Sequence, residues 1–210
     1  MNRSQLAVCL LVAAVAVAGG CKPKDEAAPA TGGTETGTAA TPAGAGSTVV
    51  PAAPAGGDET AEAKATLSSP DSKIGGTVTF TQDGYNVKVV ADVTGLSPGK
   101  HGIHVHEYGK CDAPAFESAG AHVNPDGAAH GCPGSPEFHP GDLGNIEVGA
   151  DGKGHLEMTT SALTVTPGSN SVVGKAVLLH ERVDDCVSRP AGNSGGRIAC
   201  GLVEQSSGPQ

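Results

Sequence analysis

Positive charge and aromatic side chains are both scarce in this sequence. Lys and Arg number 13 against 22 Asp and Glu, which gives a formal net charge of −9 at pH 7. Such a balance argues against a nucleic-acid surface and against binding anionic lipid by charge. Trp is absent and there are only two Tyr and three Phe, yet the chain carries eight His. An anionic substrate would therefore need a local positive patch, and the many imidazoles need an explanation of their own.

Long apolar runs are scarce too. The run from Leu6 to Ala18 is too short for a comfortable membrane span and is typical of the apolar part of a signal peptide. Two glycines and then Cys21 follow, an order typical of the lipidation site of bacterial lipoproteins. We therefore interpret residues 1–20 as a lipoprotein signal peptide and expect Cys21 to be lipidated. An ordinary secretory signal that leaves Cys21 free is the alternative.

Large apolar residues are rare in residues 21–64, which consist mainly of Ala, Gly, Thr and Pro with scattered charges. Such a segment cannot bury enough surface to offset the entropy lost on ordering. We expect a disordered tether between the lipid anchor and a folded domain of residues 65–210; a tail without any role beyond spacing is the alternative. The remaining length is enough for one good core.

Helical periodicity is missing from the folded part, where short runs of β-type alternation recur instead. Turn residues at 82–84 and 151–152 separate neighbouring runs. The runs span residues 77–81, 85–93, 102–107, 145–148, 154–160, 171–181 and 197–203. This pattern predicts an all-β fold, either an antiparallel sandwich or a barrel. Two Gly- and Pro-rich stretches, 108–141 and 183–196, interrupt it as long loops.

What the sequence has in excess is a spaced set of metal-ligand residues. Imidazole is the commonest side-chain ligand for zinc, copper and nickel. Six of the eight His and one Asp form the set, namely His104, His106, His122, His130, His139, Asp142 and His180. The array predicts a metal enzyme.

Strand geometry and donor type divide this set into two groups. His104 and His106 are two residues apart on an expected strand, so they point to one face, and His180 ends another strand. Imidazoles without a thiolate favour copper, with zinc as the competing choice. The second group has three nitrogen ligands and one oxygen ligand, which suits a closed tetrahedral zinc site. Its members are His122, His130, His139 and Asp142.

Five ordered motifs resemble the copper/zinc superoxide dismutase family. They are GLSPGKHGIHVHE at 95–107, SAGAHVNP at 118–125, HPGDLGN at 139–145, HERVDD at 180–185 and GNSGGRIACG at 192–201. The resemblance covers residues 66–205 and implies an eight-stranded antiparallel Greek-key β-barrel with an immunoglobulin-like sandwich arrangement and two long functional loops. A short 184–197 stretch and a long loop between Cys111 and His122 resemble the bacterial exported branch.

The resemblance implies a role for each site residue. Copper would be held by His104, His106, His122 and His180, and zinc by His122, His130, His139 and Asp142, with one ion of each per subunit and His122 shared. Asp184 would link His104 to His130, the alternative being a solvated loop carboxylate. Arg197 would attract the anion beside copper, the alternative being a surface salt bridge. His101 is expected to be buried with a backbone hydrogen bond, and His155 to lie at the surface.

Four cysteines of the folded part suit disulfides in an exported protein. The resemblance implies that Cys111 pairs with Cys200. Cys132 and Cys186 have no counterpart in the usual family pattern, but each follows by two residues a partner in the expected His130–Asp184 bond. We therefore expect a second disulfide between them.

The function implied is superoxide dismutation to dioxygen and hydrogen peroxide by copper redox cycling, with Arg197 and His122 catalytic and zinc structural. Superoxide is the expected substrate, and we expect no nucleic-acid partner. The protein would lie in the periplasm or cell envelope, tethered to a membrane through its lipid. A homodimer is compatible with the resemblance. The rival hypotheses are an exported copper- or zinc-binding protein without turnover and a structural surface domain stabilised by metal.

Overall fold

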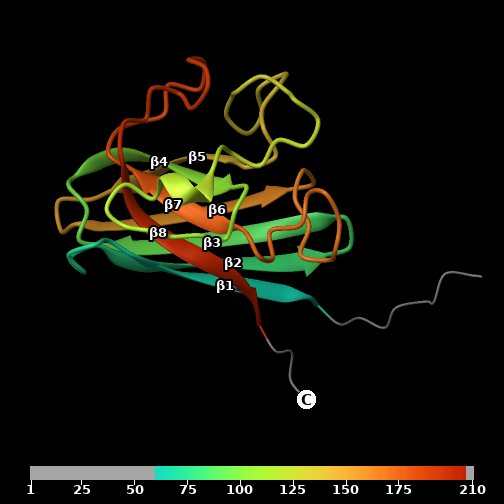
Figure 1. Ribbon diagram of the computed structural model, residues 1–210, viewed down its shortest axis with the longest axis horizontal. Helices are drawn as coiled ribbons and strands as arrows, with labels where there is room; N and C mark the ends of the chain where they lie inside the picture. Colours follow the sequence, from blue (N-terminus) through green and yellow to red (C-terminus); the bar gives the residue numbers. More distant parts are fainter. Residues whose placement is uncertain (1–59, 207–210) are drawn as a thin grey trace, which may run out of the picture. The chain divides into compact units, whose positions relative to one another are not determined.

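The computed structural model describes residues 60–206, which form a closed barrel of antiparallel strands (Figure 1). Of the two alternatives left open by the strand pattern, the barrel is therefore the one adopted. The strands are β1 (Glu62–Ser68), β2 (Gly75–Asp83), β3 (Asn86–Thr94), β4 (Gly99–His106), β5 (Asp142–Val148), β6 (Lys153–Thr160), β7 (Ala176–His180) and β8 (Arg197–Gln205). The expected signal peptide, Cys21 and residues 21–59 of the expected tether lie outside the described residues.

Neighbouring strands follow the order β1-β2-β3-β6-β5-β4-β7-β8 around the barrel. Strands β4, β5 and β6 are consecutive neighbours, and β7 then returns to lie beside β4. This return is a Greek key. It places β4 between β5 and β7, so that residues from all three strands meet around the histidines of β4.

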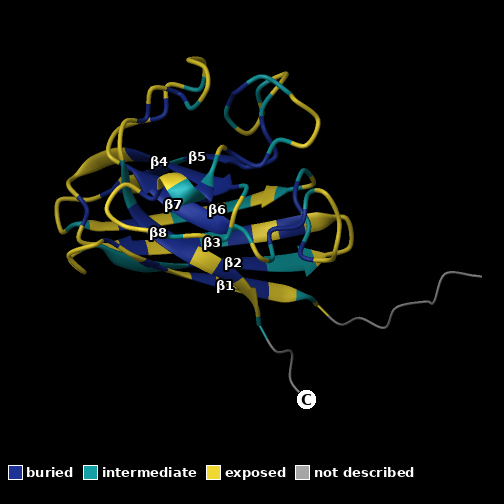
Figure 2. Cartoon of the chain, in the orientation of Figure 1, coloured by how far each residue is buried: buried dark blue, intermediate teal, exposed yellow. Residues whose placement is uncertain are grey.

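The barrel interior is filled by the alternate residues that the strand pattern predicts. Val78 and Phe80 of β2 and Val87, Val89 and Ala91 of β3 have no exposed surface. Figure 2 shows buried and exposed residues alternating along the lower strands. At about 25 cal/mol per Å² of apolar surface, this burial is the main term that stabilises the barrel.

Strand β4 departs from this alternation because its last six residues are all buried. Ile103 and Val105 belong to the barrel core. His104 and His106 alternate with them and so point out of the barrel. Their burial at 0% and 1% exposure comes from the two long loops, which lie over this face (Figures 1 and 2).

The structure differs from the expected strands at several places. Strand β1, Glu62–Ser68, was not among the expected runs, and it begins before residue 65. The strand expected over 171–181 is confined to Ala176–His180, because the chain turns at Gly174, where φ is +77° and Lys175 N–H bonds to Val172 O. One short 3-10 turn, Glu117–Ala119, lies in the first long loop. Among residues 60–206, no helix has the length and apolar character needed to cross a membrane.

Candidate metal centre

The outward face of β4 and the end of β7 carry three of the four candidate ligands of the first group. His104 and His106 come from β4, and His180 is the last residue of β7, next to a register shift in the β7–β8 ladder. His122 comes from the first long loop, which runs antiparallel to β4 and pairs with it at His106. One nitrogen from each of these four rings lies within 4.8 Å of the other three, so the group can hold one metal ion.

A second group shares His122 with the first. Its other members are His130 and His139 of the first long loop and Asp142, the first residue of β5. Their ligand atoms also lie within 4.8 Å of one another. His122 Nδ1 is 2.7 Å from Asp142 Oδ1, and His139 Nδ1 is 3.2 Å from the same oxygen. Three imidazoles and one carboxylate in a compact group are a donor set typical of zinc.

Buried ring nitrogens without hydrogen-bond partners mark where ions would sit. Within the described chain they are His104 Nδ1, His106 Nε2, His122 Nε2, His130 Nδ1 and His180 Nε2. A buried polar atom without a hydrogen-bond partner costs free energy. Five such nitrogens close together therefore indicate that another group, such as a metal ion, binds them. Four of these nitrogens belong to the first ligand group and the fifth belongs to the second. The residues therefore fit two metal ions, and His122 directs one nitrogen at each.

The remaining ring nitrogens are fixed by hydrogen bonds. His106 Nδ1 donates to Gly120 O at 3.0 Å, and His180 Nδ1 lies 3.3 Å from Gly195 O and 3.1 Å from Ser194 Oγ. Such bonds fix the tautomer of a ligand ring and its orientation. They leave Nε2 free to bind a metal in both His106 and His180.

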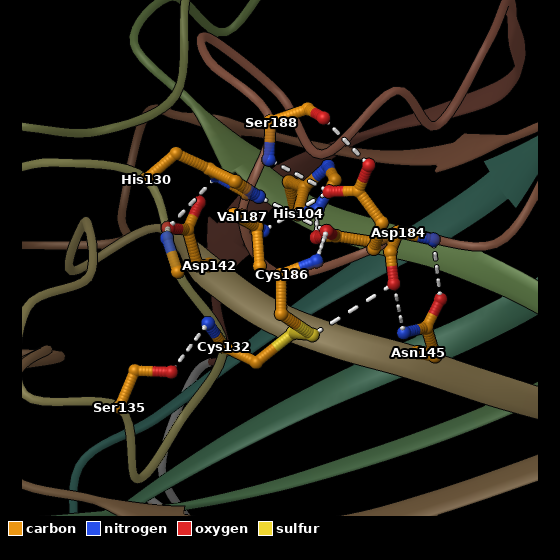
Figure 3. The surroundings of a disulfide bond; sticks show 12 residues. His104, His130, Cys132, Ser135, Asp142, Asn145, Asp184, Cys186, Val187 and Ser188 are labelled. Atoms are coloured by element: carbon orange, nitrogen blue, oxygen red, sulfur yellow. Dashed lines mark hydrogen bonds and ion pairs between the residues drawn. A yellow bond between two sulfur atoms is a disulfide. The ribbon is translucent and has the colours of Figure 1, made fainter.

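Asp184 performs the same task for two rings at once. His104 Nε2 donates to Asp184 Oδ2 at 2.8 Å, and His130 Nε2 donates to Asp184 Oδ1 at 3.0 Å. The carboxylate is 2% exposed, which excludes the solvated loop carboxylate as an alternative. One side chain thus joins a ring of the first ligand group to a ring of the second (Figure 3).

Burial keeps the ligands in the form that binds metal. It lowers the pKa of His104 to about 4 and the pKa of His180 to about 3, so both rings are neutral at pH 7. Burial alone would raise the pKa of Asp184. Hydrogen bonds from His104, His130 and the Cys186 N–H oppose it and hold that pKa well below the ordinary range.

Arg197 begins β8 directly opposite His180 in the β7–β8 ladder. Its Nη1 donates to Phe116 O at 2.7 Å and its Nη2 to Gly120 O at 2.6 Å. Within residues 60–206 no carboxylate lies within ion-pair distance of it, so the surface salt bridge is excluded as its role. Arg197 lines a cavity of about 520 Å³ together with His106, His122 and His180. A fixed cation thus faces the first ligand group in an acidic protein.

Both expected disulfides are formed. Cys111 bonds to Cys200 with a Cα–Cα distance of 5.7 Å, and Cys132 bonds to Cys186 with a Cα–Cα distance of 4.9 Å. The first ties one long loop to β8 near Arg197, and the second ties the two long loops to each other. Two disulfides in a domain of this size suit an oxidising compartment.

The two histidines set aside from the ligand set lie as expected. His101 is 3% exposed, and its Nδ1 donates to His180 O at 2.9 Å. His155 is exposed on β6 and lies 2.8 Å from Asp92 Oδ1. The backbone oxygens of Phe116 and Gly120 are contacts that sequence reasoning missed, because any residue type can supply a carbonyl.

Comparisons with known proteins agree with this geometry. The family described as copper/zinc superoxide dismutase matches residues 74–203. A protein of Brugia pahangi described as an extracellular superoxide dismutase [Cu-Zn] is 40% identical over 154 residues, which cover 69% of this chain and 76% of that protein.

Proposed function

Because this chain belongs to the copper/zinc superoxide dismutase family, we propose that its two ligand groups hold copper and zinc with His122 shared between them. The protein is a superoxide dismutase, and copper and zinc are its cofactors. The observation that carries the proposed assignment is the set of buried, unpartnered ring nitrogens. Copper would be held by His104, His106, His122 and His180, and zinc by His122, His130, His139 and Asp142.

The choice of metal for each group follows from its donors and its access to solvent. Four imidazoles without a carboxylate suit copper, and three imidazoles with Asp142 suit zinc. Three members of the copper group, His106, His122 and His180, line the cavity beside Arg197, whereas the zinc group contributes only His139 besides the shared His122. The copper group is therefore the one more open to a diffusing anion. Bound copper supplies one-electron redox chemistry, and bound zinc supplies a structural charge.

Arg197 is proposed to attract superoxide and to orient it. Two of its nitrogens donate to the carbonyls of Phe116 and Gly120, which fix the guanidinium plane. No carboxylate of residues 60–206 forms an ion pair with it, and the nearby Glu117 acts on its charge only at longer range. A fixed cation raises the local concentration of a small anion, and this effect weakens as salt increases.

His122 is proposed to handle a proton in the reaction. Hydrogen peroxide formation requires two protons, and His122 Nε2 faces the copper group from the wall of the cavity. An imidazole that holds a proton at Nε2 can donate it to the product there. Its Nδ1 lies 2.7 Å from Asp142 Oδ1 within the second ligand group, so zinc bound there would hold the ring in place.

A spectroscopic experiment tests whether His122 is shared. Cobalt(II) would replace zinc, and its visible spectrum would be recorded before and after copper is added. A shared imidazole predicts that copper changes the cobalt spectrum in the natural protein. In a His122→Ala variant, with both metal contents confirmed, copper should leave the cobalt spectrum unchanged. An unchanged cobalt spectrum in the natural protein would contradict the shared ligand.

Export and membrane anchoring are proposed on separate grounds. Two disulfides support folding outside a reducing cytosol, and the residues around Cys21 support lipidation within the bacterial exported branch. The Brugia pahangi relative is described as extracellular. The location proposed is the periplasm or cell envelope. Intact mass of the membrane-extracted protein tests the anchor: a mass with acyl chains on Cys21 supports it, and an unmodified Cys21 contradicts it.

A homodimer is proposed as the assembly state. Sedimentation of the folded domain at micromolar concentration tests it, since a dimer and a monomer differ twofold in mass. A single monomeric species would contradict the proposal.

A further inference from the structure

The Cys132–Cys186 disulfide joins the same two loop segments that the His130–Asp184 hydrogen bond joins. Cys132 follows His130 by two residues, and Cys186 follows Asp184 by two residues. Figure 3 shows the sulfur–sulfur bond beside the Asp184 carboxylate and the rings of His104 and His130. A covalent link and a hydrogen bond therefore both hold these two loop segments next to each other.

The disulfide acts on Asp184 through the Cys186 backbone. Cys186 N–H donates to Asp184 Oδ1 at 2.7 Å, on the same oxygen that accepts from His130. The Asp184 backbone is held by Asn145 of β5, which donates to Asp184 O at 2.9 Å and accepts from Asp184 N–H at 2.8 Å. Asn145 thus fixes the main chain, and the disulfide fixes the amide that orients the carboxylate.

The first long loop needs such a tie. Residues 123–141 contain no strand or helix, and most residues of 124–138 have exposed or intermediate burial. In the proposed site, zinc would hold this segment through His130 and His139. The disulfide spans a sequence separation of 54 residues and ties the segment to the Asp184 loop whether or not an ion is bound. A cross-link that closes a loop of this length removes many alternative arrangements of it.

We propose that the Cys132–Cys186 disulfide is a positioning element for the copper site, one that keeps Asp184 and hence His104 aligned independently of zinc. The inference rests on the proposed assignment of copper to the group that contains His104. The disulfide would act by orienting Asp184 and not by binding metal, because neither sulfur belongs to the proposed copper or zinc group. The carboxylate links the Cys186 N–H to the His104 ring, since it accepts hydrogen bonds from both.

The test compares copper binding with and without zinc in the natural protein and in Cys132→Ala/Cys186→Ala. Both cysteines are replaced because free thiols beside Asp184 would form a new ligand group. The control is Cys111→Ala/Cys200→Ala, which also loses one disulfide from the first long loop. Copper dissociation constants and copper(II) electron paramagnetic resonance spectra are measured on metal-free protein loaded with copper alone, then with zinc added.

For the natural protein we expect zinc to change the copper dissociation constant by less than about threefold and to leave the spectrum unchanged. The Cys132→Ala/Cys186→Ala variant should bind copper about tenfold more weakly without zinc and recover when zinc is added, since loss of a group that orients a ligand typically costs 10- to 100-fold in affinity. The Cys111→Ala/Cys200→Ala control should show no greater dependence of copper binding on zinc than the natural protein, whatever its absolute copper affinity. Equal zinc dependence in the natural protein and the Cys132/Cys186 variant would overturn the proposal.

Hydrogen exchange of the natural protein provides a second test that needs no folded variant. The amide of Cys186 should stay protected when zinc is removed, because the disulfide keeps it on its acceptor, Asp184 Oδ1. The amide of Asp184, which Asn145 holds, is the internal reference. Exchange of the Cys186 amide at the rate of exposed loop amides in the zinc-free protein would overturn the proposal. If no histidine-bound copper signal appears in any sample, the copper assignment fails, and the exchange result still decides whether the disulfide holds Asp184 without zinc.

Discussion

Arg197 Nη1 donates a 2.7 Å hydrogen bond to the carbonyl oxygen of Phe116, a residue 81 positions earlier in the chain. Phe116 has a left-handed backbone with φ of 54°, and its side chain packs in a small cluster with Ala119, Ala176, Leu178 and Cys200. The aromatic ring thus anchors the loop whose carbonyl aims the guanidinium. The position of the Arg197 guanidinium therefore depends on how Phe116 packs in the first long loop.

Replacing Phe116 should therefore affect catalysis through Arg197. Phe116 is 4% exposed, and Phe→Ala at such a site typically costs ~3–5 kcal/mol of unfolding free energy. We expect Phe116→Ala to lower this free energy and to lower the rate of superoxide removal in molecules that remain folded and hold copper. Phe116→Leu, which keeps most of the volume, should lose much less of both. A Phe116→Ala protein with the natural rate and salt dependence would show that Arg197 does not depend on this anchor.

Neutralising Arg197 tests electrostatic attraction directly. In Arg197→Gln the rate of superoxide removal should fall and become less sensitive to ionic strength, because the fixed cation beside the copper group is gone. The control is Lys153→Gln, which removes one positive charge at the start of β6, outside the cavity. It should keep the natural rate and salt slope. Equal slopes for the natural protein and Arg197→Gln would remove the steering role.

Gly192 is expected to be required by the Asp184 contact. A Cβ at this position would overlap the Asp184 carboxylate and approach the His130 ring, and the backbone φ is +61°. Gly192→Ala should displace Asp184 and weaken zinc and copper binding by about tenfold or more, as expected when a group orienting the ligands is lost. Equilibrium titration with each metal measures both affinities.

Gly84→Ala is the matched control for that substitution. Gly84 has a similar φ of +56° in the β2–β3 turn, and a Cβ there meets nothing within 4 Å. Its backbone strain should reduce stability by about 1 kcal/mol without changing metal affinity. If both variants bind metal equally well, the close approach of Gly192 to Asp184 has no role in the site.

The metal-free protein should lose stability as pH falls below about 6.5. Burial lowers the pKa of His104 from 6.5 to about 4 and that of His180 to about 3. Between these values and 6.5 the unfolded chain binds more protons than the folded one, so protonation favours unfolding. Above pH 6.5 both states are neutral at these rings and the contribution is constant.

Urea unfolding of metal-free protein at pH 7, 5.5 and 4.5 measures this effect. His180→Gln should reduce the dependence on pH, and His155→Gln, which changes an exposed residue, should not. A flat free energy of unfolding over this interval in the natural metal-free protein would contradict the account of burial.

The proximity of two candidate ligands could be predicted from the sequence by strand geometry. His104 and His106 are two residues apart on one strand, so their shared face follows from alternation alone. The strand pattern did not distinguish a barrel from a sandwich, and it did not predict strand β1. Ala63 and Ala65 alternate correctly in β1, but Ala has a weak preference for strands, and pairing with β2 and β8 supplies what the local sequence lacks.

Other features depend on contacts that a linear pattern does not contain. The strand expected from residue 171 begins later because Gly174 has a positive φ, which turns the chain and interrupts the run of β-type residues. The carbonyls that hold Arg197 come from loop backbone, whose position follows from packing of Phe116 and from the Cys111–Cys200 disulfide. Reading the sequence therefore identified donors with distinctive chemistry and missed backbone acceptors.

The most direct test of the central claim combines metal analysis with superoxide removal on the same purified, disulfide-bonded protein. The account predicts one copper and one zinc per chain, rapid superoxide disappearance with both metals, and loss of that activity when copper alone is withdrawn. Protein that holds both metals in full and does not accelerate superoxide disappearance would contradict it and would favour a metal-binding protein without turnover.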